Sequence, residues 1–138
     1  MGTKSLILVL AITSAGSAAC LKGHPSVKKE FAQSELVATV QVIGSRHVPA
    51  PKNGEFNDGT YYKLRLIEGL KGNPPATFTV FDENDSGRFD MDMHRKYLIF
   101  ANKSSEKRLR IDSCGNSGLL NESAQALKVA RSLSQKAN

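Results

Sequence analysis

The two cysteines constrain this chain more than any other feature of its sequence. The 138-residue chain has no others, and the first, Cys20, follows an apolar run and a cluster of small residues. Lys4, the run LILVLAI at 6–12 and the small residues before Cys20 form the three parts of a secretory signal peptide. We therefore expect residues 1–19 to be removed and the protein to be secreted or periplasmic.

Export determines how the cysteines are interpreted. Outside the reducing cytosol two cysteines usually form one disulfide, so Cys20 and Cys114 are the candidates for a bridge. Such a bridge would tie the front of the chain to a point near its end and stabilise it by about 4 to 5 kcal/mol on the chain-entropy model. The apolar run at 6–12 is too short to cross a bilayer, and we expect no transmembrane segment.

The remaining residues, 20–138, have the typical size of one domain with its own hydrophobic core. The formal net charge of the whole chain is +6. A basic exported protein suits acidic partners, anionic membrane surfaces or cell-wall polymers, but a charge of this size more often serves solubility. We therefore expect a single domain, and the charge by itself names no partner.

Five segments have the composition and alternation of short β-strands. In the second, Leu64 and Leu66 face one side while Lys63 and Arg65 face the other. Connections rich in Pro, Gly and Asn separate the segments, and the longest of them is 45–59. The five expected strands are 35–43, 60–72, 76–82, 96–101 and 107–114.

A helix is expected after the strands, from about 122 to 135. Asn121 can cap it, because an Asn side chain accepts from unpaired backbone amides, and the apolar residues that follow form one stripe. Five short antiparallel strands suit a small closed barrel, which has no exposed edges. We predict a mainly β fold, an OB-fold five-stranded antiparallel barrel with a C-terminal helix.

Several short motifs occur in an informative order. Phe31 lies eleven positions after Cys20, and SELV at 34–37, LKG at 70–72 and SGRFDMDMHRKYLIFA at 86–101 follow before Cys114. This pattern resembles the netrin-like modules, in particular the N-terminal domain of the tissue inhibitors of metalloproteinases, and extends to about Leu120. The resemblance implies an OB-fold barrel whose N terminus is held by disulfides.

The resemblance also implies a function. In that family the amine and carbonyl of the first mature cysteine chelate the catalytic zinc of the target protease, which keeps an open coordination position. The implied chelating group is the backbone of Cys20, and the implied partner is a zinc metalloprotease whose pocket would accept the next side chain, Leu21. The implied inhibitory edge comprises Leu21, Lys22, Gly23, His24, Ser86 and Gly87.

The chain departs from the family pattern at three positions. Lys22, Ala32 and Ser86 stand where family members have cysteines. In an ungapped alignment Cys20 and Cys114 belong to two different family bridges, and they can pair only if the N-terminal segment is displaced by two residues. The mature end would then lie upstream of Cys20, and the chelating role would pass to another residue or disappear. The alternative function is a non-inhibitory extracellular or envelope interaction module.

The same residues are also compatible with two other functions. A lipoprotein modified at Cys20 is one, although Ser17 stands where lipidation sites usually have Leu. Single-stranded nucleic acid binding is the other, because OB-folds use aromatic platforms in a cationic groove. Export and the strand alternation both disfavour nucleic acid. The residues concerned are Tyr61, Tyr62, Phe78, Phe81, Lys63, Arg65, Arg108 and Arg110.

Metal binding and catalysis are not expected either. The tract that starts at Asp82 resembles the start of an EF-hand loop, but Met93 occupies the position that requires a bidentate Glu. His24, His47 and His94 are scattered without ligand spacing, and neither cysteine has a neighbouring base. We therefore predict a binding module without cofactor or metal, and not an enzyme.

Overall fold

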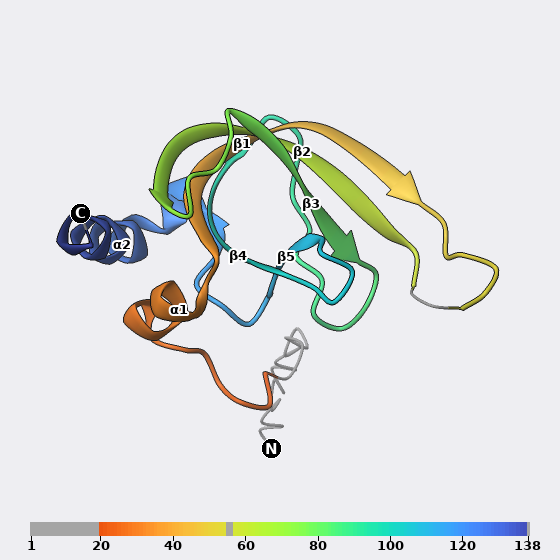
Figure 1. Ribbon diagram of the computed structural model, residues 1–138, viewed down its shortest axis with the longest axis horizontal. Coiled ribbons are helices and arrows are strands. Elements are labelled where there is room, and N and C mark those ends of the chain that lie inside the picture. Colours follow the sequence, from red (N-terminus) through yellow and green to blue (C-terminus); the bar gives the residue numbers. More distant parts are fainter. Residues whose placement is uncertain (1–19, 55–56, 138) are drawn as a thin grey trace, which may run out of the picture.

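A curled antiparallel sheet with two helices at one end forms the described part of the chain (Figure 1). The structure is a computed structural model that describes residues 20–54 and 57–137. The predicted signal peptide, residues 1–19, lies outside the described residues. The strands are β1 (Leu36–Val48), β2 (Gly59–Lys71), β3 (Thr77–Glu83), β4 (Lys96–Lys103), β5 (Leu109–Ile111) and β6 (Gly118–Leu119).

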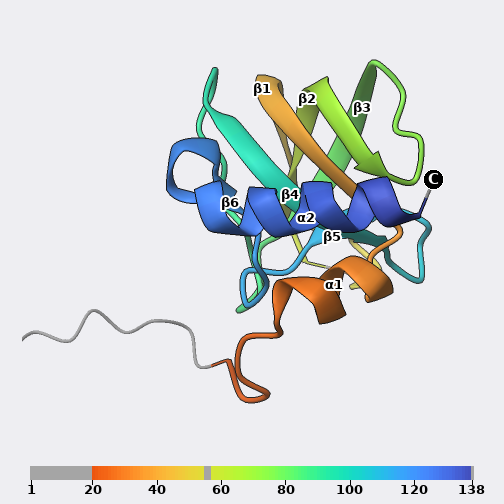
Figure 2. The same cartoon turned by 90° about the vertical axis from the view of Figure 1, so that its left-hand side faces the viewer.

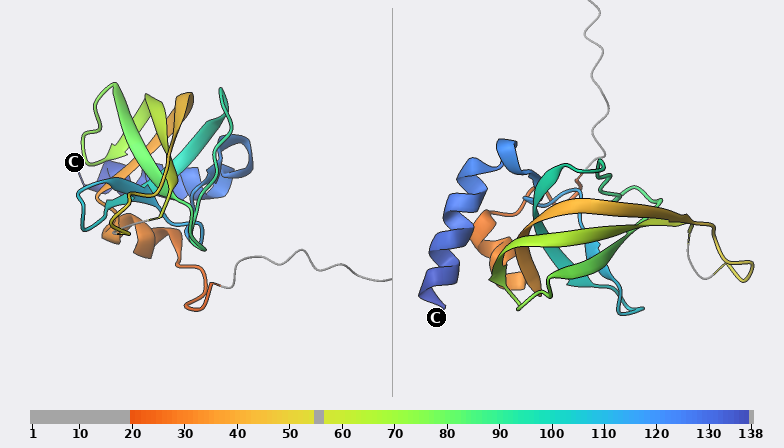
Figure 3. Two further views of the ribbon diagram at one scale, coloured as in Figure 1. Left: turned by 90° about the vertical axis from the view of Figure 1, so that its right-hand side faces the viewer. Right: turned by 90° about the horizontal axis from the view of Figure 1, so that it is seen from above.

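The strand order in the sheet is β3-β2-β1-β4-β5, and the short β6 also pairs with β4. Every pairing is antiparallel. The predicted mainly β class with a C-terminal helix is confirmed. The predicted strands are all present, but β1 continues to Val48 because its pairing with β2 extends as far as the Val48 and Gly59 pair. The β1–β2 hairpin therefore projects away from the helices (Figure 3).

Closure of the sheet into a barrel is not confirmed. The two edge strands, β3 and β5, come close together, but in the part of the chain that the structure describes no backbone ladder joins them. Arg110 of β5 spans this opening and forms ion pairs of 2.9 Å with Glu83 and with Asp85. β5 ends at Ile111, where the chain turns toward Cys20, so it is too short to pair along β3.

The helices pack on the outer surface of the sheet and lie side by side (Figure 2). They are α1 (Val27–Gln33) and α2 (Ala124–Lys136). The sequence analysis missed α1, whose N-cap Ser26 accepts a hydrogen bond from the Lys29 amide. The predicted Asn121 cap is wrong, because a 3₁₀ turn, η1 (Leu120–Glu122), precedes α2 and Ser123 occupies its N-cap position.

Two apolar layers hold the fold together, one inside the curl of the sheet and one between the sheet and the helices. The inner layer contains Leu36, Ala38, Val40, Val42, Tyr62, Leu64, Val80, Met91, Tyr97, Ile99, Ala101 and Ile111. The outer layer contains Phe31, Val37, Leu70, Leu98, Phe100 and Ala130. Because successive strand residues point to opposite faces, β1 and β4 contribute to both layers.

Among the described residues no helix is long and apolar enough to span a bilayer.

Candidate functional site

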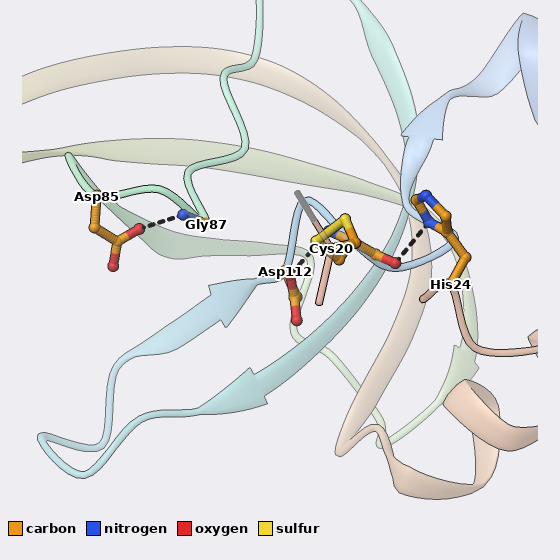
Figure 4. Close-up of a disulfide and its surroundings, with 6 residues drawn as sticks. Cys20, His24, Asp85, Gly87 and Asp112 are labelled. Carbon is orange, nitrogen blue, oxygen red and sulfur yellow. Dashed lines mark hydrogen bonds between the residues drawn. A yellow bond between two sulfur atoms is a disulfide. The ribbon is translucent and has the colours of Figure 1, made fainter. Parts of the chain in front are cut away.

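The predicted disulfide is present and joins the leading segment to the end of the sheet (Figure 4). The sulfurs of Cys20 and Cys114 are 2.06 Å apart, and the two Cα atoms are 5.7 Å apart. Cys114 lies in the turn 112–116 that follows β5, and its amide donates to Asp112 Oδ1 over 2.9 Å. The bridge therefore attaches the start of the described chain to this turn.

Three hydrogen bonds order the segment after Cys20. The Gly23 amide donates to the Cys20 carbonyl over 2.8 Å and closes a tight turn, in which Gly23 has a φ of +69°. His24 Nδ1 donates to the Cys114 carbonyl over 2.9 Å, and Asn116 Nδ2 donates to the Pro25 carbonyl over 3.0 Å. The leading segment is thus attached to the turn 112–116 at both of its ends.

A buried carboxyl group also holds the turn 112–116 in place through hydrogen bonds. Glu30 of α1 is 9% exposed, and its Oε2 accepts from both the amide and the Nδ2 of Asn116, each over 2.6 Å. Gly115 lies against this carboxyl, and a Cβ at that position would overlap Glu30 Oε1. Burial raises the pKa of Glu30, and the hydrogen bonds from Asn116 partly offset that increase.

Glu30→Gln should change how stability depends on pH. A carboxyl whose pKa is higher in the folded state favours folding most when protonated, so wild-type stability should fall as pH rises from roughly 4.3 through the raised pKa. Glutamine cannot ionise. The free energy of unfolding of the wild type minus that of Glu30→Gln should therefore decrease with pH across this window.

Urea unfolding of both proteins between acidic and neutral pH measures this difference. Glu122→Gln, which removes an exposed carboxyl of η1 outside this cluster, is the matched control. A difference that stays constant with pH, or that increases, would contradict the role given to Glu30.

Leu21 is presented to solvent by the clamped turn. Its side chain is 96% exposed, more than the two other large apolar side chains that are exposed in the described residues, Ile67 and Met93. Lys22, Gly23 and His24 are also exposed. Four residues of the predicted edge therefore lie together on one ordered surface segment.

The other two predicted edge residues reach the same turn from β3. Ser86 and Gly87 lie in the loop after this strand, where the Gly87 amide donates to Asp85 Oδ1 over 2.8 Å. The Gly87 carbonyl accepts from the Ser113 amide over 3.3 Å, directly beside Cys114. The turn 112–116 therefore brings the leading segment and this loop to one side of the sheet (Figure 4).

Two open recesses flank Asp112 at this side. One, of about 770 Å³, is lined by residues 20–26 and by Glu30, Asp112 and Cys114, among others. The other, of about 410 Å³, includes Gly87 and shares Glu30 and Asp112 with the first. Lys22 and Lys29 also line the first recess, and Lys103 and Arg110 line the second, so the surface beside Leu21 carries charges of both signs.

The remaining candidates lie elsewhere. His47 is in the β1–β2 hairpin, 3.5 Å from Asp58, and His94 is in a turn before β4 with a φ of 65°. Tyr62 and Phe78 point into the inner layer, whereas Tyr61 packs against Phe81 on the opposite face. Among residues 20–54 and 57–137 no group of three His, Cys, Asp or Glu side chains is arranged to hold a metal ion.

The sequence analysis missed Glu30 and Asn116 as supports of the edge. They are separated by 86 positions, and neither belongs to a short motif.

A scan against protein-family models gives no match, and a search of curated proteins finds no significantly similar sequence.

Proposed function

We propose that the chain is an exported protein-binding module whose contact edge is formed by residues 20–24, and that its partner is a zinc metalloprotease. The observation that carries the proposal is the almost fully exposed Leu21 on a turn attached by a disulfide and by His24. The netrin-like resemblance supplies the class of partner. The neighbouring loop with Ser86 and Gly87 extends the edge.

The physical support is preorganisation. A flexible segment loses conformational freedom when it binds, and this loss subtracts from its affinity. Here the folded chain has already ordered the segment, because its ends are attached to the turn 112–116. An apolar side chain such as Leu21 contributes about 1.5 to 3 kcal/mol when a partner removes it from water.

We propose the zinc-chelating group from the disulfide and the family resemblance taken together. Cys20 pairs with Cys114, which is the register displaced by two residues relative to the family pattern. Cleavage after Ser17 would leave Ala18 as the first residue, and Ala15 and Ser17 are small enough for the peptidase. We therefore propose that the amine and carbonyl of Ala18, rather than of Cys20, approach the zinc. An α-amino group titrates near pH 8, so a neutral fraction is available for coordination.

A non-inhibitory interaction module is the second candidate, and one observation favours it. The Cys20 carbonyl already accepts the Gly23 amide over 2.8 Å, so the chelating group that the resemblance implies is partly occupied, and the zinc-directed function depends wholly on a chain that starts at Ala18. This candidate uses the same edge and Leu21, but it does not require a free amine near a metal.

Leu21→Ala should weaken binding to an inhibited zinc protease by roughly tenfold or more, because each buried CH₂ contributes about 0.8 kcal/mol. The inhibition constant of the exported protein against a panel of zinc proteases is the measurement. Met93→Ala removes a similar exposed apolar side chain outside the edge and should leave the constant unchanged.

Mass spectrometry of the exported protein separates the two candidates further. A free amine at Ala18 together with inhibition supports the zinc-directed function. A lipid on Cys20, or no inhibition anywhere in the panel, contradicts it. Binding of a non-protease partner that is lost with Leu21→Ala would then identify the interaction module.

A further inference from the structure

The outer surface of the sheet that the helices leave uncovered carries a continuous group of basic side chains. The strand register places Lys96, Gln41 and Arg65 side by side across β4, β1 and β2. We call this surface the cationic face. Its residues are Gln41, Arg46, Tyr61, Lys63, Arg65, Thr77, Thr79 and Lys96, with Arg108 beside them.

Two further strand pairs extend the cationic face toward the end of the β1–β2 hairpin. Lys63 pairs with Thr79 of β3, and Arg46 pairs with Tyr61, two residues further along the hairpin. Residues two apart on a strand are about 7 Å apart on the same face. The basic side chains of this surface are therefore close neighbours.

No carboxylate interrupts the described residues of the cationic face. On one side lies Glu68, which Arg131 of α2 holds through three hydrogen bonds of 2.7 to 3.2 Å. On the other side Glu83 pairs with Arg110 over 2.9 Å. These two carboxylates are thus already paired with other cations. Glu106 interacts electrostatically with Arg108, so acidic charge reaches this surface only at the margin beside Arg108.

Two arginines of the cationic face lie against aromatic rings. The guanidinium carbons of Arg46 and Arg108 are 5.2 and 5.8 Å from the centroid of the Tyr61 ring, and that of Arg108 is 4.6 Å from the centroid of Phe81. Cation–π contacts of this kind restrict long side chains, so less conformational freedom is lost when they bind an anion.

We propose that the cationic face binds a linear acidic polysaccharide whose charged groups are carboxylates or sulfates. Grouped like charges repel one another, and anionic groups on a ligand would remove this repulsion. Exposed hydroxyls of Thr77 and Thr79 lie among the cations, where they can exchange hydrogen bonds with sugar hydroxyls. The Gln41 amide accepts from Arg65 Nη2 and donates to the His94 carbonyl, so it helps to order Arg65 within this surface.

Other polyanions fit this surface less well. Single-stranded nucleic acid needs aromatic rings on which bases stack, but Phe81 is 3% exposed and two arginines lie against the Tyr61 ring. A lipid surface is favoured by apolar side chains that enter the membrane beside the cations. The cationic face as defined contains no exposed large apolar side chain among its described residues.

The experiment compares two variants that carry the same change in charge. Lys63→Gln/Lys96→Gln removes two exposed cations from the cationic face, and Lys28→Gln/Lys128→Gln removes two exposed cations from the helices. Dissociation constants are measured for heparin, polygalacturonate and neutral dextran, and for oligo(dT) and phosphatidylglycerol vesicles. Thermal unfolding confirms that each variant is folded.

Heparin or polygalacturonate should bind the wild type, with an affinity that falls as salt is added. Lys63→Gln/Lys96→Gln should weaken this binding by roughly tenfold or more, and the helix variant should change it by less than about threefold. If heparin binds and polygalacturonate does not, the charged groups of the ligand are sulfates. If polygalacturonate binds, carboxylates are sufficient. The proposal is overturned if neither glycan binds, if both variants weaken binding equally, or if oligo(dT) or vesicles bind more tightly through the same lysines.

Discussion

Replacing both cysteines, in Cys20→Ala/Cys114→Ala, is expected to lower the free energy of unfolding by about 4 to 5 kcal/mol. The bridge joins residues that are 94 positions apart. It therefore closes α1 and the strands β1 to β5 into one loop, and on the chain-entropy model a loop of this length restricts the unfolded state strongly. Domains of this size are stable by only about 5 to 15 kcal/mol. The variant should therefore lose a substantial part of its stability, which urea unfolding measures.

Reduction of the wild-type protein is a second test of the same prediction. Without the bridge, residues 20–25 still have the His24 and Asn116 hydrogen bonds to the turn 112–116. Wild-type protein treated with a reductant should match the double variant. A loss below about 1 kcal/mol in both samples would contradict the stabilising role of the bridge.

Phe100→Ala is expected to cost about 3 to 5 kcal/mol, because it leaves a cavity in the layer between sheet and helices. The Phe100 side chain is 2% exposed and packs in the layer that contains Phe31 of α1 and Ala130 of α2. Urea unfolding of the variant and the wild type measures the loss. α1 also carries Glu30, so the support beneath the turn 112–116 depends on this layer.

Phe78→Ala is the matched control for Phe100→Ala. Phe78 is a partly buried residue at the margin of the inner layer, so its truncation should cost clearly less. Equal losses in the two variants would contradict the view that the layer beneath the helices is tightly packed around Phe100.

The two cysteines illustrate what a sequence can show without coordinates. Only one intramolecular pairing is possible for two cysteines, and an export signal makes that pairing the expected state. The alternation in β2 was equally informative, because Leu64 points into the inner layer while Lys63 and Arg65 are exposed, as predicted. A period of two residues directly reports side-chain direction in a strand.

The helix α1 and the opening between β3 and β5 were beyond such reasoning. α1 has seven residues, which is too short for a reliable helical period, and its position depends on the apolar layer that Phe31 enters. The opening depends on where β5 ends, and Arg110 crosses it through side-chain contacts that no local pattern encodes.

Four features could be predicted from the residues without coordinates: the mainly β class, the inward and outward faces of the strands, the C-terminal helix and the identity of the bridged cysteines. These follow from the composition of the chain, from the periodicity of its apolar residues and from the presence of only two cysteines. The tertiary structure alone decided that Glu30, Asn116 and His24 would support the leading turn, and that basic residues of three strands would form one cationic face. Such groupings depend on the pairing of strands distant in the chain, because register, and not sequence proximity, places their side chains together.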